Sequence, residues 1–268
     1  MKKKLLFGLL LPLIVFTWGL SYGAPFNLTS NNSTAVIDPA LQMGMSNWTV
    51  DGTDHLFQQW FWYRVGPTGG ESSIDTLTLN SATQAAANIL VLSYSNSDFD
   101  LSITYTLLGG SPGSKTSDIA ETIGIFNTSG AALDFHFFQY SDFDLFGTAG
   151  NDIASHDNVN KISQSDPQGT LSETVAVPDP SHWQIAFFAA IRNSLTDGNP
   201  TTLSDAASPF GPGDITWAWQ WDRVIAQGGA FIISKDKHLS GKIPEPISLI
   251  LLGSGLAGVG LVRRFRKK

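Results

Sequence analysis

Several residue types that support common folds and activities are absent or scarce in this chain of 268 residues. There is no cysteine, which excludes disulfides, thiolate nucleophiles and cysteine-ligated metals, so stability must come from a packed core. Only four glutamates occur, and the five histidines show no HExxH or comparable ligand spacing. His136 lies in an aromatic run and is expected to be a strand residue. The sequence therefore predicts neither a zinc site nor a marked glutamate acid/base pair.

Basic side chains are scarce in the middle of the chain. Between residues 24 and 243 there are 22 acidic and 8 basic side chains, a net charge of about −14. The remaining lysines and arginines lie within the first four and the last six residues. Because an acidic surface repels phosphate backbones, no nucleic-acid partner is expected.

A sustained 3.6-residue hydrophobic period is also missing. Instead, short runs rich in β-branched and aromatic residues alternate with clusters of Gly, Pro, Asn, Asp and Ser. Strands are predicted at 55–64, 74–79, 89–94, 101–108, 119–126, 133–140, 171–177, 183–189, 215–221 and 230–234. The pattern predicts an all-β fold, an antiparallel β-sandwich of roughly 10–12 strands. Two short helices are expected beside it, at 81–87 and 201–207.

One folded domain is expected, a β-sandwich over residues 41–236. Residues 24–40, rich in Asn, Ser and Thr, predict a flexible arm before it. Residues 146–168 predict a long polar connection. The segment 215–234 is expected to form a closing hairpin, because the glycines within 226–229 can adopt positive φ.

The N-terminus has the composition of a secretory signal peptide. Lys2, Lys3 and Lys4 precede an apolar run over 5–20, and small residues follow at Ser21 and Gly23. Cleavage after Gly23 is predicted, so residues 1–23 are removed by signal peptidase and the protein is exported. The alternative is an uncleaved anchor helix.

The C-terminus has three parts in a fixed order. A polar spacer, 237–243, leads to Pro244, Glu245 and Pro246, and an apolar run follows over 247–262. The chain ends in a basic cluster made of Arg263, Arg264, Arg266, Lys267 and Lys268. As a helix the apolar run would be about 24 Å long against a hydrocarbon core of about 30 Å, and the basic cluster can extend it by snorkelling. A single C-terminal transmembrane helix, with the basic cluster stopping transfer on the cytoplasmic side, is therefore predicted.

This tail, residues 244–268, resembles the PEP-CTERM sorting signal of exported bacterial surface proteins. The resemblance implies that an exosortase recognises Pro244, Glu245 and Pro246 and removes the helix. The protein would be anchored transiently in the inner membrane and then passed to the cell surface or an extracellular matrix, with exopolysaccharide as a further expected partner. An ordinary tail anchor that is never cut is the alternative.

Two motifs of catalytic appearance fail on physical grounds. Residues 109–113 match GxSxG, but Pro112 follows the serine and has no N–H for an oxyanion hole. This segment is predicted to be a hairpin loop. Residues 253–258 match GxGxxG, yet no βαβ unit or downstream acid accompanies them. Small residues there suit close approach of membrane helices instead.

A repeated SDFDL segment gives one candidate metal site. On a strand, Asp98 with Asp100, and Asp142 with Asp144, would share a face while the intervening phenylalanine points inward. With acidic residues of the adjoining loop these carboxylates could hold Ca²⁺, which takes six to eight oxygen ligands. The alternative is a solvated acidic face. No other cofactor is expected.

Tryptophans on the predicted strands leave the function of the sandwich open. Trp60 with Trp62, or Trp217 with Trp219 and Trp221, could form platforms for sugar rings, although large aromatics more often fill cores. The main prediction is a non-catalytic structural or adhesive surface protein, not an enzyme. The alternatives are a secreted carbohydrate-binding or carbohydrate-active module and a calcium-stabilised adhesin.

Overall fold

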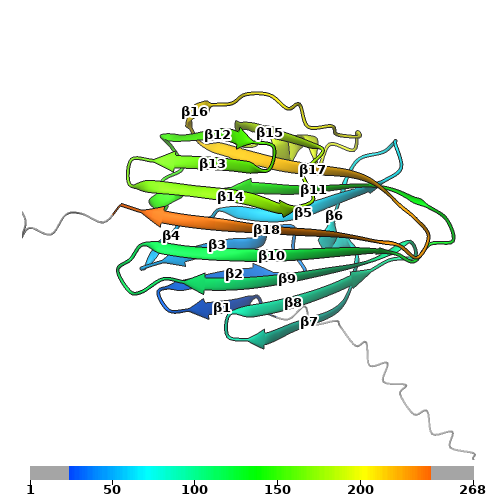
Figure 1. Ribbon diagram of the computed structural model, residues 1–268, viewed down its shortest axis with the longest axis horizontal. Coiled ribbons are helices and arrows are strands. Elements are labelled where there is room, and N and C mark those ends of the chain that lie inside the picture. Colours follow the sequence, from blue (N-terminus) through cyan, green and yellow to red (C-terminus); the bar gives the residue numbers. More distant parts are fainter. Residues whose placement is uncertain (1–23, 243–268) are drawn as a thin grey trace, which may run out of the picture.

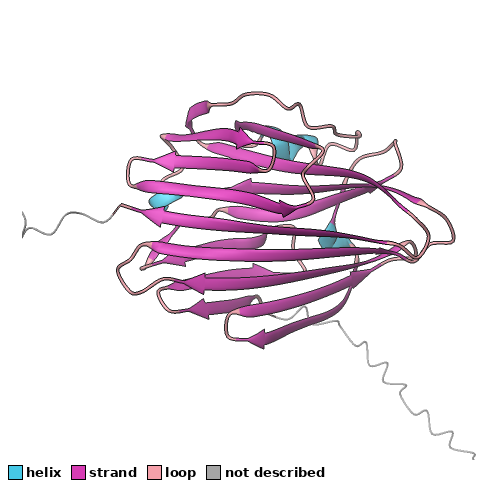
Figure 2. Ribbon diagram, viewed as in Figure 1, coloured by secondary structure: helices cyan, strands magenta, loops and turns pink. Residues whose placement is uncertain are grey.

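The computed structural model describes residues 24–242, which form two nine-stranded sheets stacked face to face (Figure 1). Strands make up nearly all of the regular structure, with only a few helical turns at the margins (Figure 2). All strand pairs are antiparallel except a short parallel contact between β3 and β5. The predicted all-β sandwich is thus confirmed, but the described residues form 18 strands, more than the number predicted.

Each sheet draws strands from both halves of the chain. Sheet A has the order β1 (Phe26–Ser30), β2 (Ser33–Asp38), β3 (Gly44–Val50), β5 (Gln58–Val65), β11 (Leu133–Asp142), β17 (Ile215–Ile225) and β15 (His182–Phe187), with β4 (Thr53–Asp54) and β6 (Ser72–Ser73) paired at its sides. Sheet B has the order β16 (Phe210–Gly213), β12 (Asp152–Asn158), β13 (Lys161–Asp166), β14 (Gly169–Val177), β18 (Ala230–Gly241), β10 (Thr116–Asn127), β9 (Phe99–Gly109), β8 (Ile89–Ser95) and β7 (Thr78–Ala86).

Aromatic side chains fill the space between the sheets because alternate residues of a strand face the same side. On β11 the inward residue Phe137 packs against Phe61 of β5, with ring centroids 5.5 Å apart, and against Trp221 of β17 at 6.2 Å. Phe135 meets Phe99 of sheet B at 4.9 Å. The aromatic residues of β11 therefore belong to the core. This core stabilises a chain that has no disulfides.

The outer face of sheet A is also largely covered. The 3₁₀ helix η1 (Ile74–Thr76) and the short helix α1 (Ala190–Ser194) lie over it, and both bury an isoleucine there. Trp60 donates to Asp75 Oδ1 at 3.1 Å, and the backbone N–H of Leu203 donates to Gln220 Oε1 at 2.8 Å. Strand β5 is buried on both faces for this reason.

Both predicted helices are wrong. Residues 81–87 belong largely to the edge strand β7, which pairs with β8, and residues 201–207 have no regular structure. Helix propensity of the alanine run is a weak preference that a pairing partner overrides. The short helix forms instead at α1, beginning at Ala190.

Two predicted boundaries are also wrong. Residues 24–40 do not form a loose arm, because β1 and β2 lie within them and Leu28, Ala35 and Ile37 are buried. Residues 237–243 are not a spacer, since β18 continues to Gly241. In both segments the buried positions alternate with exposed ones, which is the strand period.

Two predicted connections differ as well. The turn at 226–229 does not close a hairpin: β17 belongs to sheet A and β18 to sheet B, so this turn crosses between the layers. The supposed connection 146–168 contains β12 and β13. By contrast, the predicted hairpin loop at 109–113 is confirmed, since it begins at the last residue of β9 and lies within the connection to the paired strand β10.

The targeting segments lie outside the described residues. They include residues 1–23 and the sorting and basic residues Pro244, Glu245, Pro246, Arg263, Arg264, Arg266, Lys267 and Lys268. Within residues 24–242, no helix has the length and apolar character needed to cross a membrane.

Candidate functional site

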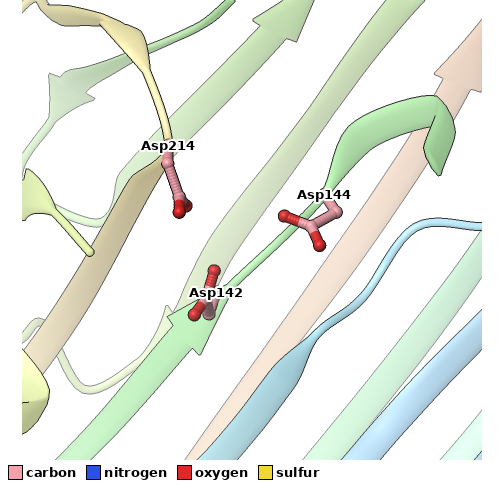
Figure 3. Close-up of side chains that lie close together, drawn as sticks. All are labelled: Asp142, Asp144 and Asp214. Carbon is pink, nitrogen blue, oxygen red and sulfur yellow. The ribbon is translucent and has the colours of Figure 1, made fainter. Parts of the chain in front are cut away.

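Three aspartates meet at one end of the outer face of sheet A. Asp142 is the last residue of β11, Asp144 precedes the 3₁₀ helix η2 (Leu145–Gly147), and Asp214 stands between β16 and β17. One carboxylate oxygen from each lies within 4.8 Å of the others. Figure 3 shows the three side chains pointing toward a common space. Together they form the acidic cluster.

The environment of the acidic cluster favours protonation. Asp142 is 1% exposed, and its burial raises its pKa to about 7, with further increases from Asp214 and Asp144. The Tyr140 hydroxyl donates to Asp142 Oδ2 at 3.0 Å and partly offsets this rise. Burial also raises the pKa of Asp144 and of Asp214. Near neutral pH the cluster can therefore hold one proton while it keeps negative charge.

The acidic cluster lines a hollow of about 170 Å³, and two aromatic rings form another part of its wall. Phe57 and Phe188 are 40% and 41% exposed, and their ring centroids are 5.9 Å apart in an edge-to-face arrangement. A second hollow of about 550 Å³ adjoins it and shares Phe57 and Asp144. The two hollows together provide an apolar wall beside a row of carboxyl groups.

The cationic side chain of Arg192, on α1, lies beside this site. The Arg192 guanidinium lies 4.8 Å from the centre of the Phe188 ring, and its Nη1 donates to Gln58 Oε1 at 3.3 Å. Its charge lowers the pKa of Asp142, although less than burial raises it. Arg192 therefore stabilises one wall of the hollow without neutralising the acidic cluster.

A fourth carboxyl lies buried near η2. Asp152 is fully buried, and this burial raises its pKa to about 7. Gln164 donates to Asp152 Oδ2 at 2.5 Å, while Asp152 Oδ1 and Gln164 Oε1 have no partner among the described residues. Asp152 does not line the hollow, but its interaction with Asp144 adds to the negative field there.

The structure brings together two of the four predicted calcium ligands. Asp142 and Asp144 join the acidic cluster, whereas Asp100 is exposed on β9 of the other sheet and Asp98 lies in the turn before it. Asp214 was missed because it is about 70 residues from Asp142 along the chain. The register of β11 and β17 brings Asp214 to Asp142, because Asp142 pairs with residue 216, two positions after Asp214.

The proposed aromatic platforms do not exist on the described surface. Trp60, Trp62, Trp217, Trp219 and Trp221 are all fully buried. The exposed rings beside the acidic cluster are phenylalanines at 57 and 188, which the sequence did not mark because neither lies in an alternating aromatic ladder.

A chain of histidines and aspartates occupies the other end of the same outer face. His136 Nδ1 lies 2.6 Å from Asp222 Oδ1, and His182 Nδ1 lies 2.6 Å from Asp205 Oδ2. His182 Nε2 is 3.5 Å from Asp222 Oδ2, which joins the two pairs. His136 is a strand residue as predicted, and its ring is held by these contacts. The two hollows beside the acidic cluster do not include these histidines, so the acidic cluster is the better candidate site.

The chain carries a recognisable sorting signal. A model of the PEP-CTERM protein-sorting motif matches residues 242–267, which confirms the resemblance of the tail. The protein is accordingly an exported, surface-sorted substrate of exosortase. The sandwich itself is unrelated to this motif, and a search of curated protein sequences finds no match.

Solved structures with the same fold include carbohydrate-active enzymes. A bacterial glucoamylase complexed with acarbose has a TM-score of 0.56 at 8% identity over 86% of this chain, which spans 36% of the glucoamylase. A galactose mutarotase related enzyme from Lactobacillus acidophilus has a TM-score of 0.52 at 7% identity, covering 82% of this chain and 99% of the other. At such identities the likeness shows the fold alone.

These structures overturn the prediction that the protein is not an enzyme. That prediction depended on the lack of a recognisable catalytic motif in the sequence, whereas the similar structures are enzymes that share the fold. The acidic cluster shows that this fold brings together residues that are far apart in the sequence. Missing local motifs therefore do not argue against catalysis here.

Proposed function

We propose that this exported, exosortase-sorted protein is carbohydrate-active and that its sugar site is the hollow beside the acidic cluster. The observation that carries the proposal is the meeting of three carboxyl groups, one with a pKa of about 7, beside two exposed aromatic rings. The glucoamylase and mutarotase-related structures support this choice of substrate class, since both names denote proteins that act on sugars.

The chemistry proposed is acid–base catalysis at the anomeric carbon of an aldose or glycosyl residue. A buried carboxylic acid can protonate a ring or leaving-group oxygen, while a second carboxylate activates a hydroxyl or a water. Asp142 is assigned the acid role because its burial raises its pKa to about 7. Asp144 and Asp214 share the role of base.

The aromatic walls would bind the apolar face of a sugar ring. Phe57 and Phe188 present exposed ring surface at the mouth of the hollow, and the carboxyl groups behind them can accept hydrogen bonds from sugar hydroxyls. A sugar bound in this way would have its anomeric carbon near Asp142 and would shield the carboxyl groups from water.

The route to the surface is part of the proposal. Signal peptidase would release residues 1–23, and the tail would hold the protein briefly in the inner membrane. Exosortase would then cut at Pro244, Glu245 and Pro246 and pass the sandwich to the surface, where polysaccharide is available as a substrate. Mass spectrometry of the surface fraction tests this route, and an intact peptide containing Phe265 would contradict it.

A panel of aldoses and oligosaccharides tests the catalytic proposal. Anomer exchange can be followed by proton NMR and glycosidic cleavage by the release of reducing ends. The wild-type protein should act on at least one compound, and Asp142→Asn should lower its kcat/KM by about 10²-fold or more. Asp100→Asn, an exposed aspartate on the other sheet, is the matched control and should retain full activity. Wild-type inactivity across the panel, or full activity of Asp142→Asn, would reject the proposal.

Calcium binding is a second candidate for the same carboxyl groups. Three carboxylate oxygens within 4.8 Å can contribute to the oxygen shell of Ca²⁺, and a cation would relieve their mutual repulsion. Of the four aspartates that the sequence predicts as calcium ligands, only Asp142 and Asp144 belong to this candidate site, and Asp214 is added to them. Millimolar Ca²⁺ should raise the melting temperature of the wild type but not of Asp214→Asn; an unchanged wild-type melting curve would dismiss this candidate.

A further inference from the structure

Four charged side chains lie together in the core between the sheets, away from the acidic cluster. Glu121 projects from β10, Glu173 from β14, and Lys235 and Lys237 from the strand β18 between them. None of the four side chains has any exposed surface. This buried quartet has no access to a ligand in solution, so any reaction that it undergoes must occur among its own members.

Contacts within the quartet centre on one carboxyl group. Lys235 Nζ contacts Glu121 Oε2 and donates to Glu173 Oε1 at 3.0 Å. Lys237 Nζ contacts Glu121 Oε1 and lies 3.9 Å from Glu173 Oε1. The Glu121 carboxyl is therefore held between two amines, with the second carboxyl in reach of both.

The surroundings keep Glu173 in place and exclude water. Gln139 and Trp217 of sheet A donate to Glu173 Oε2 at 2.9 and 3.1 Å. The Phe61 ring lies 5.5 Å from Lys235 Nζ. Since water is excluded, an amide formed here would be protected from hydrolysis.

The two lysines differ in protonation. Burial lowers the pKa of Lys237 below its ordinary value, despite the nearby carboxylates. Burial also acts to lower the pKa of Lys235, but Glu121 and Glu173 outweigh it and the pKa is raised. Burial acts to raise the pKa of Glu173, and both lysines outweigh it, so that its pKa is lowered. Lys237 is thus the amine that most readily becomes neutral, while Lys235 stays charged.

We propose that Lys237 and Glu121 are joined by an intramolecular isopeptide bond that forms after folding. Transfer of a proton from the Lys237 ammonium to the Glu121 carboxylate leaves a neutral amine beside a neutral carboxylic acid. Lys237 Nζ then attacks Cδ of Glu121, a C–N bond forms, the C–O bond to the hydroxyl breaks, and one water leaves. The reaction consumes no oxidant, reductant or other reactant.

The other two members of the quartet assist this step. Lys235 donates to the Glu121 oxygen that becomes the amide carbonyl and so stabilises negative charge that develops there. Glu173 accepts the proton that the attacking nitrogen loses and returns it to the departing hydroxyl, so it ends the reaction unchanged. The product ties β10 to β18, the last strand before the sorting signal, in a chain that has no cysteine.

The test uses the purified full chain, denatured and analysed by mass spectrometry. After the terminal peptides have defined the ends, the wild-type mass should be lower than the sequence mass by one water. Trypsin should yield a branched peptide that joins residues 116–161 to residues 236–242, with no cleavage after Lys237. Lys237→Arg should restore the missing water and yield linear peptides. Lys242→Arg is the matched control and should keep the bond, because Lys242 lies outside the quartet, where its Nζ donates to the Pro167 carbonyl.

The wild-type peptide map decides the matter even if Lys237→Arg fails to fold. Cleavage after Lys237 and a free linear peptide 116–161 would overturn the proposal. Loss of water that persists in Lys237→Arg and disappears in Lys235→Arg would overturn the assignment of the nucleophile.

Discussion

Replacing Asp142 with asparagine should change how the stability of the protein depends on pH. The carboxyl has an ordinary pKa of 3.8 and a folded-state pKa of about 7. Between these values the folded protein keeps a proton that the unfolded chain has released, so the free energy of unfolding falls as the pH rises. The difference between the two pKa values corresponds to about 4 kcal/mol of stability. This stability is fully lost once the pH exceeds the folded-state pKa. The asparagine of Asp142→Asn does not ionise, so this variant does not lose that stability as the pH rises.

Urea denaturation of the two proteins at about pH 4 and about pH 8 measures this effect. The two proteins should have similar stability at the lower pH. At the higher pH Asp142→Asn should be the more stable by up to about 4 kcal/mol, since the Tyr140 hydroxyl can still donate to the amide oxygen. Asp152 has a raised pKa in both proteins, so its contribution to the pH dependence of stability cancels when the two are compared.

Asp100→Asn is the control for this measurement, because its exposed carboxyl should change stability by less than about 0.5 kcal/mol at either pH. Identical pH dependence in Asp142→Asn and wild type would refute the account of the buried carboxyl.

Three further predictions concern the site and its supports. Asp214→Asn should lower the pKa of Asp142, because it removes a negative charge that raises this pKa; carbon NMR of the carboxyl measures the shift, and an unmoved titration would contradict it. Glu71→Ala should destabilise the protein by about 3–5 kcal/mol in urea denaturation, since it leaves the buried Arg64 guanidinium without its carboxylate at 3.0 Å; a loss below about 1 kcal/mol would be inconsistent with a buried pair. Gly44→Ala should cost about 2 kcal/mol or more in thermal unfolding, because φ is +58° and a Cβ would lie 1.9 Å from a tryptophan ring; wild-type stability would show that the backbone can shift.

Local alternation predicted the strands where one face is buried. In β9 the buried positions Leu101, Ile103, Tyr105 and Leu107 alternate with more exposed ones, and this period is visible in the sequence. The same reasoning failed for β7, where the alanine run has neither a clear apolar face nor a signal for its partner β8. Such an edge strand forms because it pairs with β8, whose paired residues are 3–17 positions away in the sequence, and intrinsic propensity does not determine it.

Relations between distant strands could not be predicted. The segment 215–234 has the pattern of a hairpin, yet its strands enter different sheets, where β17 pairs with β11 and β18 pairs with β10. The acidic cluster depends on the same kind of relation. The repeated SDFDL segment singled out Asp142 and Asp144, although Asp144 lies beyond the end of β11 and not on the predicted strand. Only the pairing of β11 with β17 brings Asp214 to them.

Burial explains the remaining differences at the site. The tryptophan ladders were considered as sugar platforms, but all five rings are fully buried. Trp60 lies under the covering segment at 74–76, where it donates to Asp75, whereas Trp217 and Trp221 face the core between the sheets. The same covering leaves Phe57 and Phe188 exposed at its margin. Which aromatic rings remain accessible thus depends on where loops cross a sheet, a property with no local signature in the sequence.

The pH dependence of kcat/KM on the best sugar from the panel tests the catalytic proposal most directly. Asp142 as the essential acid predicts that activity falls as the pH rises through about 7, and that Asp214→Asn moves this fall to lower pH. A profile with no fall near pH 7, or one that Asp214→Asn leaves in place, would contradict the assignment of the acidic cluster as the catalytic site.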